Sequence, residues 1–286
     1  MKKTSLILSS VATIALSLTG CGGGSSPTSS AKTGTGYYID NAVAGANYTC
    51  GSKTGTTDKD GKFTFEQGKE CTFEVAGVTL RKVPADNLVD NAKIVENNVT
   101  VARFLQSIDT DGDLSNGIQI TGETIAVLTK ALQQENIETV PNTTTELETV
   151  VSHIEQEDGN FSGHVVTEEE AQNHLQATQS SVLNELLAGK TFYVPGIDGE
   201  NTKILVKVVV NNNATSATWN WIEGPVKSGT ITVKIQGNMI IAENPQEFLG
   251  QTADYLKIIE HHKDGHTVNA RWYYSEAKAQ EYLKSL

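Results

Sequence analysis

The acidic segment from Asp109 to Gly117, DTDGDLSNG, is the part of the sequence best suited to bind an ion. It places carboxylates at Asp109, Asp111 and Asp113, and Asn116 adds an amide oxygen. Oxygen ligands at alternate positions suit Ca²⁺, and clustered carboxylates repel each other unless a cation is present. We therefore predict a structural calcium site here, with a turn of solvated carboxylates as the alternative.

This segment resembles the D-x-D-x-D calcium loops of EF-hands, dockerins and thrombospondin-type repeats, and the match is partial. Gly112 stands inside the triplet of carboxylates rather than after it. Ile120 occupies the twelfth position, where an EF-hand places its bidentate Glu. The resemblance therefore implies a weak structural site rather than a calcium sensor.

Three histidines surround a Lys-Asp-Gly turn near the end of the chain. His262 and His266 could face each other across a hairpin as transition-metal ligands, with His261 beside them. No cysteine or second motif completes such a site. We interpret the three as incidental residues of an exposed hairpin tip.

Tryptophans on predicted strands are the remaining candidates for ligand contacts. Trp219 and Trp221 stand two residues apart and so share one strand face, and Trp272 lies on a later strand. These rings could line a ligand cavity or stack on a sugar, but a barrel also needs bulky side chains to fill its interior. Core filling is the favoured interpretation, with a ligand-lining role as the alternative.

The sequence contains none of the common catalytic motifs. G-x-S-x-G, H-E-x-x-H, Walker and G-x-G-x-x-G strings are all absent. We therefore expect the protein not to be an enzyme. A pair of carboxylates for glycoside hydrolysis stays open, because such partners are usually distant in sequence.

The charge of the chain argues against nucleic acid as a partner. The 286 residues carry a net charge of −12, and loss of a leader with Lys2 and Lys3 would leave 20 basic against 34 acidic residues. Phosphate binding requires a basic face.

At this length the chain has room for two or three domains.

The first 21 residues, MKKTSLILSSVATIALSLTGC, have the form of a cleaved leader. Two lysines precede an apolar stretch over residues 5–18, which is too short for a resident transmembrane helix. The final Leu-Thr-Gly-Cys resembles a bacterial lipobox, which implies that residues 1–20 are a lipoprotein signal peptide and that Cys21 carries a diacylglycerol. An ordinary signal peptide with an incidental cysteine is the alternative.

Residues 21–36 are small and polar, a composition typical of a flexible tether. Gly22 after Cys21 resembles lipoproteins sorted to the outer membrane. We therefore expect a protein of the bacterial cell envelope, lipid-anchored at the outer membrane, whose partner is the membrane through its N-terminal lipid.

The two remaining cysteines, Cys50 and Cys71, are predicted to form a disulfide. An exported chain meets an oxidising environment, and with Cys21 assigned to the lipid only this pairing is left. A redox-active pair is the alternative, but the close Cys-x-x-Cys spacing that tunes such a thiol is missing.

Residues 37–83 alternate in hydrophobicity as strands do, with Asp-Gly and Gln-Gly turns between them. The string AVAGANYTC followed by GTTDKDGKFTF resembles carboxypeptidase regulatory-like, prealbumin-like domains. That resemblance implies a small β-sandwich that serves as a structural or adhesive module. Asp58 and Asp60 are interpreted as turn residues.

The rest of the chain predicts helices followed by a second β-domain. Residues 84–189 have helical periodicity, with capping boxes at Thr143-x-x-Glu146 and Thr167-x-x-Glu170, and Gly189 placed to end the last helix. Residues 190–286 alternate with period two and predict about seven antiparallel strands and a C-terminal helix. The predicted fold class is multi-domain α+β, with a C-terminal antiparallel barrel or sandwich that is lipocalin-like in outline.

Together these features predict a lipid-anchored, calcium-stabilised binding, adhesion or structural module without catalytic activity. Its partner would be an unknown protein or glycan. The first alternative is a lipocalin-like carrier of a small apolar or glycan ligand in the barrel. The second is a hydrolase with an unrecognised carboxylate pair.

Overall fold

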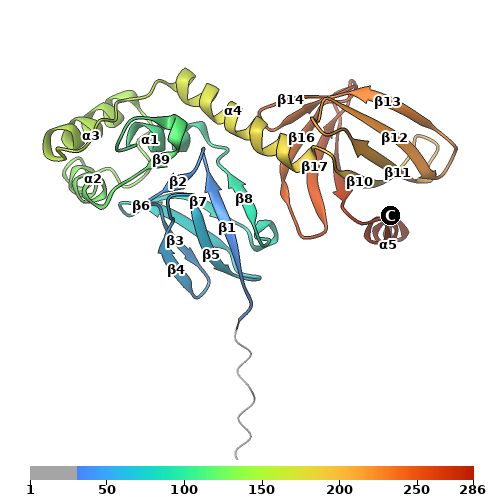
Figure 1. The fold of residues 1–286 in the computed structure, drawn as a ribbon, viewed down its shortest axis with the longest axis horizontal. Coiled ribbons are helices and arrows are strands. Elements are labelled where there is room, and N and C mark those ends of the chain that lie inside the picture. Colours follow the sequence, from blue (N-terminus) through green and yellow to red (C-terminus); the bar gives the residue numbers. More distant parts are fainter. Residues whose placement is uncertain (1–30) are drawn as a thin grey trace, which may run out of the picture. The chain divides into compact units, whose positions relative to one another are not determined.

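Residues 31–286 are described by a computed structural model (Figure 1). Cys21, the leader and most of the predicted tether lie outside the described residues. Within residues 31–286 the chain has mixed α and β structure, with five α-helices and two separate regions of sheet. No helix in this part is long and apolar enough to cross a membrane.

Two small sheets and a two-stranded pair, β2 (Val43–Ala44) with β9 (Ile118–Gln119), form the first region and share one core. The first sheet has the order β5 (Lys62–Glu66), β1 (Thr33–Ile39), β8 (Ala92–Val95), and the second has the order β4 (Lys53–Thr56), β3 (Asn47–Cys50), β6 (Cys71–Val75), β7 (Val78–Val83). Tyr38 of the first sheet stacks on Phe73 of the second, with ring centroids 4.6 Å apart. Cys50 and Cys71 stand opposite each other in β3 and β6 and are bonded, which confirms the predicted disulfide.

Strand β1 begins at Thr33, so the prediction that the tether reaches residue 36 is wrong. Its glycines lie under aromatic rings of the neighbouring strand: a Cβ at Gly34 would lie 2.5 Å from Cζ of Phe65, and one at Gly36 would lie 2.6 Å from Cζ of Phe63. The lack of side chains, which made this segment look like a linker, is what lets the two rings pack on the strand.

The helices follow as α1 (Val99–Ser107), α2 (Gly122–Gln134), α3 (Thr144–Glu157) and α4 (Glu168–Leu187). The buried faces of α1, α2 and α3 join the same core as the two small sheets, so residues 84–189 have no core of their own. Both capping boxes are confirmed at the starts of α3 and α4. Gly189 follows the end of α4 with φ +69°, as predicted for a C-terminal cap.

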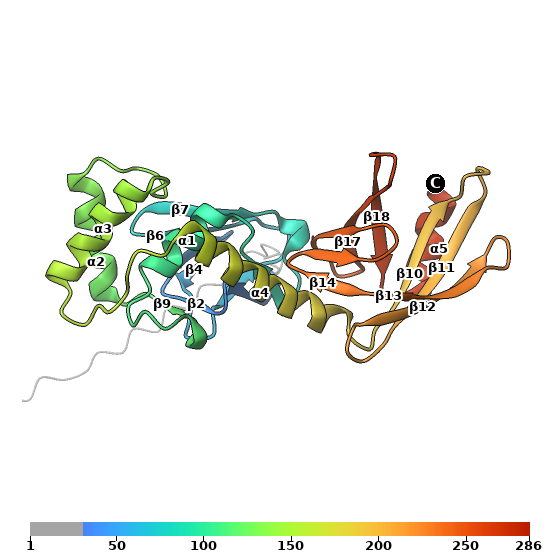
Figure 2. The same ribbon diagram turned by 90° about the horizontal axis from the view of Figure 1, so that it is seen from above.

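Nine antiparallel strands form the second region (Figure 2). Their order in the sheet is β13 (Ser228–Thr232), β12 (Ser216–Glu223), β11 (Lys203–Val210), β10 (Thr191–Ile197), β18 (Thr267–Tyr273), β17 (Tyr255–His261), β16 (Gln246–Gln251), β15 (Met239–Ile241), β14 (Lys234–Gln236). Only Val233 separates β13 from β14, although these strands are the two edges of the sheet. The edges therefore approach each other and the sheet is a nearly closed barrel. The region thus has nine strands where about seven were predicted.

Helix α5 (Glu276–Ser285) lies on the outer face of this sheet, beside β10 and β11 (Figure 2). It buries Leu205 completely, together with Tyr273, under Ala279 and Leu283. The predicted C-terminal helix is therefore present, and it covers the outer face of the sheet at this place.

Candidate functional site

The inner face of the barrel-like sheet contains a cavity of about 160 Å³. Its walls are mainly aliphatic side chains, which come from strands β10 to β13 and β15, from residues next to these strands, and from the end of α4: Leu187, Val194, Val206, Val208, Val210, Ala217, Ile231, Val233, Ile240 and Ala242. The alternation of β11 places every second residue of that strand on this wall. A dry cavity of this size holds a molecule about as large as one aromatic ring.

Two of the three tryptophans that the sequence suggested as candidates for ligand contacts line the cavity. Trp219 of β12 and Trp272 of β18 contribute to its wall. Trp221 is not among the lining residues, and the Lys227 ammonium lies 4.3 Å from its ring centroid as a cation–π contact. The sequence grouped Trp219 with Trp221 by parity, but the structure groups Trp219 with Trp272 across the barrel.

Two polar side chains, Gln246 and Glu260, also line the cavity. Oε1 of Glu260 accepts a hydrogen bond from Nδ2 of Asn244 at 2.9 Å, and Nε2 of His262 lies 3.6 Å from the same oxygen. A carboxylate beside an apolar wall can accept a hydrogen bond from a ligand while the wall contacts the ligand's apolar part.

The acidic loop follows α1 and contains a short 3-10 turn, Leu114–Asn116. Its carboxylates are largely used within the loop. Asp111 accepts hydrogen bonds from the backbone N–H of Asp113 and from the Asn116 amide, both at 3.0 Å. Asp113 caps the turn by accepting from the N–H and hydroxyl of Ser115. Among residues 31–286 no three His, Cys, Asp or Glu side chains are grouped so as to hold one metal ion.

Asp109 differs from the other two aspartates because its side chain is fully buried. Oδ1 accepts a hydrogen bond from the N–H of Gln119 at 2.8 Å, whereas Oδ2 has no hydrogen-bond partner in the described part of the chain. Burial raises the pKa of Asp109 to about 6, with a smaller contribution from Asp111 and Asp113 and against the effect of the Gln119 N–H. An unpartnered buried carboxylate oxygen is a group that a bound cation would satisfy.

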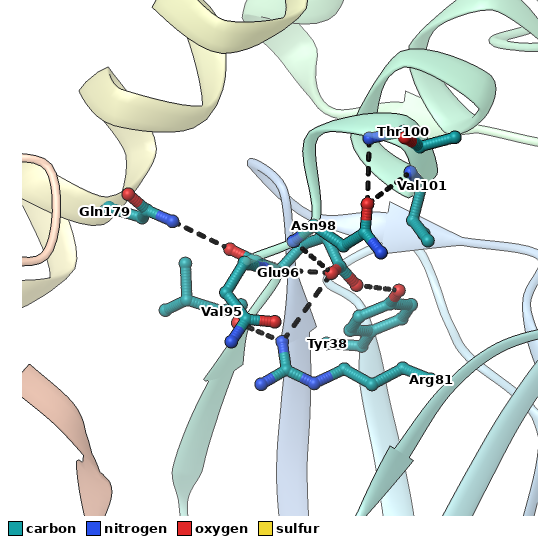
Figure 3. Close-up of polar contacts among 9 residues, drawn as sticks. Tyr38, Arg81, Val95, Glu96, Asn98, Thr100, Val101 and Gln179 are labelled. Carbon is teal, nitrogen blue, oxygen red and sulfur yellow. Dashed lines mark hydrogen bonds and ion pairs between the residues drawn. The ribbon is translucent and has the colours of Figure 1, made fainter. Parts of the chain in front are cut away.

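A second buried carboxylate, Glu96, lies directly after β8 and holds a network of hydrogen bonds (Figure 3). The Tyr38 hydroxyl donates to Oε2 at 2.6 Å, and the N–H groups of Asn97 and Asn98 donate to Oε1 at 2.9 and 2.8 Å. The Arg81 guanidinium lies 3.9 Å from Oε1. Burial, together with the charge of Glu96, raises the pKa of Tyr38 well above its usual range. Both carboxylate oxygens are satisfied, so we interpret this network as structural.

A third buried group, around Asp40, was missed by sequence reasoning. Gln106 of α1 donates to Oδ2 of Asp40 at 2.7 Å, and Nδ1 of His174 in α4 lies 3.1 Å from Oδ1. The hydrogen bond that His174 donates to the Asp40 carboxylate raises the pKa of His174, against the effect of burial. The one available signal was a polar residue, Gln106, within the apolar stretch of α1, because Asp40 and His174 are 134 positions apart.

No protein-family model matches the chain, and no curated protein or solved structure matches it either.

Proposed function

We propose that the protein is a lipid-anchored binding protein of the bacterial cell envelope whose barrel-like sheet takes up a small, mainly apolar ligand. The observation that carries this proposal is the apolar cavity with Trp219 and Trp272 in its wall. The prealbumin-like resemblance of residues 37–83 supports a structural role for the first region, as a spacer between the anchor and the binding sheet.

The lining of the cavity favours an apolar ligand over a glycan. Each sugar hydroxyl that leaves water needs a hydrogen-bond partner, and Gln246 and Glu260 are the only residues with polar side-chain groups in the lining besides the two tryptophans. The lining also argues against the hydrolase alternative. Glycoside hydrolysis uses two facing carboxyl groups, and Glu260 is the one carboxylate that lines this cavity.

Toluene should bind the cavity and raise the melting temperature. At ten times its dissociation constant a ligand adds about 1.4 kcal/mol of stability, which corresponds to a shift of roughly 3 °C or more in a thermal melt. Ala217→Leu should remove this shift, because the larger side chain points from β12 into the cavity.

Thr218→Leu is the matched control for Ala217→Leu, because Thr218 is the next residue of the same strand and is exposed on the other face. It should keep the toluene shift. A wild-type melt that does not respond to toluene, or an Ala217→Leu melt that responds fully, would contradict cavity binding.

The anchor proposed at Cys21 can be tested separately. Cys21→Ser should move the exported protein from the membrane fraction to the soluble fraction, because the lipid on this cysteine is the proposed attachment. Fractionation after a salt wash, followed by immunoblotting, measures the distribution. Retention of Cys21→Ser with the membrane would refute lipid anchoring.

We also propose that the acidic loop binds Ca²⁺ weakly, with Asp109 and Asp111 as its main ligands and Asn116 and Asp113 beside them. The unpartnered Oδ2 of Asp109 supports this proposal. The missing acidic ligand at Ile120 favours a dissociation constant of about 10⁻⁴ to 10⁻³ M.

In chelator, the stability of the wild type should fall by roughly 2 to 3 kcal/mol as the pH rises from about 4 to about 6. Burial raises the pKa of Asp109 in the folded protein from its ordinary value of 3.8 to about 6, so the folded state favours the protonated acid and loses this advantage as the group ionises. Asp109→Asn, a neutral side chain that can still accept from Gln119, should lack this loss. Chemical denaturation at several pH values measures both proteins.

Millimolar Ca²⁺ at pH 7 should restore stability to the wild type and not to Asp109→Asn, while Mg²⁺ should do much less. Glu138→Gln, which removes the charge of an exposed carboxylate outside the loop, serves as the control for a change of charge. If Ca²⁺ does not change the stability of the wild type, the loop is a polar turn that does not bind calcium.

A further inference from the structure

The hairpin that joins β17 to β18 places two imidazole rings in direct contact. The N–H of His262 donates to the carbonyl of His266 at 2.9 Å, so these residues close the hairpin and face each other across it. Their rings stack with centroids 4.1 Å apart and planes 10° from parallel. His261 points to the other face of the strand, where its Nε2 lies 3.5 Å from Glu247. The structure therefore brings His262 and His266 together across the hairpin, as their positions around the turn suggested, and places His261 apart from them.

Each ring of this pair has one nitrogen beside a carboxylate. Nδ1 of His266 contacts Oδ1 of Asp264, and Nε2 of His262 lies 3.6 Å from Oε1 of Glu260. Within the described residues no hydrogen bond engages the second nitrogen of either ring, Nε2 of His266 or Nδ1 of His262. A carboxylate on one imidazole nitrogen orients the ring and makes the other nitrogen a better metal ligand.

The surroundings of the pair are acidic. Glu260 and Asp264 contact the two rings, and Lys263 at the tip of the turn lies 3.8 Å from Glu243. The pair is also accessible, because the side chains of His262 and His266 are 29% and 55% exposed. A cation can therefore reach the free nitrogens and would be attracted by the nearby carboxylates.

We propose that His262 and His266 form a cross-strand chelate for one divalent transition metal ion, of the class that prefers imidazole: Zn²⁺, Ni²⁺ or Cu²⁺. A small rotation of the stacked rings would direct one nitrogen from each toward a shared ion. Two protein ligands bind the ion and water completes its coordination, which agrees with the lack of any group of three ligating side chains among residues 31–286. This site does not depend on the proposed cavity ligand.

Titration of the metal-free, untagged full-length mature protein with Zn²⁺ by calorimetry tests the proposal, in the absence of any apolar ligand. We expect one ion per chain at this hairpin. His262→Ala and His266→Ala should each weaken binding by roughly tenfold or more, and Asp264→Asn should weaken it by about 10- to 100-fold because it removes the carboxylate that orients His266. Thermal melts of the same variants check that they fold.

His164→Ala is the control, because His164 is an exposed histidine outside the barrel-like sheet. It should leave the affinity for Zn²⁺ unchanged. In an NMR titration the imidazole signals of His262 and His266 should shift first. Wild-type protein that does not bind Zn²⁺, or variants of His262 and His266 that bind it as tightly as the wild type, would overturn the proposal.

Discussion

Glu96→Ala should lower the free energy of unfolding by roughly 3 to 5 kcal/mol, the largest single effect that we expect in this chain. The substitution removes the acceptor of three hydrogen bonds, from the Tyr38 hydroxyl and from the N–H groups of Asn97 and Asn98. Glu96 is 1% exposed and Tyr38 is fully buried, so water cannot readily replace the lost acceptor. Urea denaturation followed by far-ultraviolet circular dichroism measures the loss.

Glu96→Gln is the matched variant, because it keeps the length and shape of the side chain. Its amide oxygen can accept from the two backbone N–H groups, and its amide nitrogen can donate to the Tyr38 hydroxyl. We expect this variant to lose clearly less stability than Glu96→Ala. A Glu96→Ala protein within 1 kcal/mol of the wild type would show that the network of Figure 3 contributes little to folding.

Replacing both Cys50 and Cys71 by Ala should cost about 3 kcal/mol on the chain-entropy model. The bond joins residues 21 positions apart and so closes the chain that contains β4 and β5. Without it the unfolded chain has more conformations to lose, and β3 and β6 must stay together through their backbone hydrogen bonds and packing. Urea denaturation with and without reductant compares the two proteins.

Reductant should destabilise the wild type and leave the double variant unchanged, which separates loss of the bond from other effects of reducing conditions. Because both cysteines are fully buried between strands, the reductant should act mainly on unfolded or partly unfolded protein. Equal stability of the wild type and the double variant would mean that backbone hydrogen bonds and packing are enough to hold β3 and β6 together.

In the acidic loop, the positions of the three aspartates differ from those that their spacing predicted. The spacing of Asp109, Asp111 and Asp113 predicted three carboxylates around one point, but Asp113 caps a turn and Asp109 is buried. Spacing determines which side chains are near in the chain. The direction in which each side chain points depends on which backbone N–H groups need an acceptor. The surrounding helices and strands determine which N–H groups those are.

Features that depend on close neighbours could be read from the sequence itself. Both capping boxes, the alternation of β11 and the role of Gly189 follow from residues within one helical turn or a few positions of a strand. The disulfide followed from elimination, because only two cysteines remained to pair. Each of these predictions needed little or no knowledge of distant contacts.

Tertiary structure alone decided which distant residues meet. It placed Gly34 and Gly36 under aromatic rings, covered Leu205 with α5, and brought Asp40 to His174. It also stacked the rings of His262 and His266, which the sequence could only place opposite each other across a turn. The physical reason is that burial and pairing across a sheet depend on contacts between segments far apart in the chain, and the same local pattern is compatible with several such pairings.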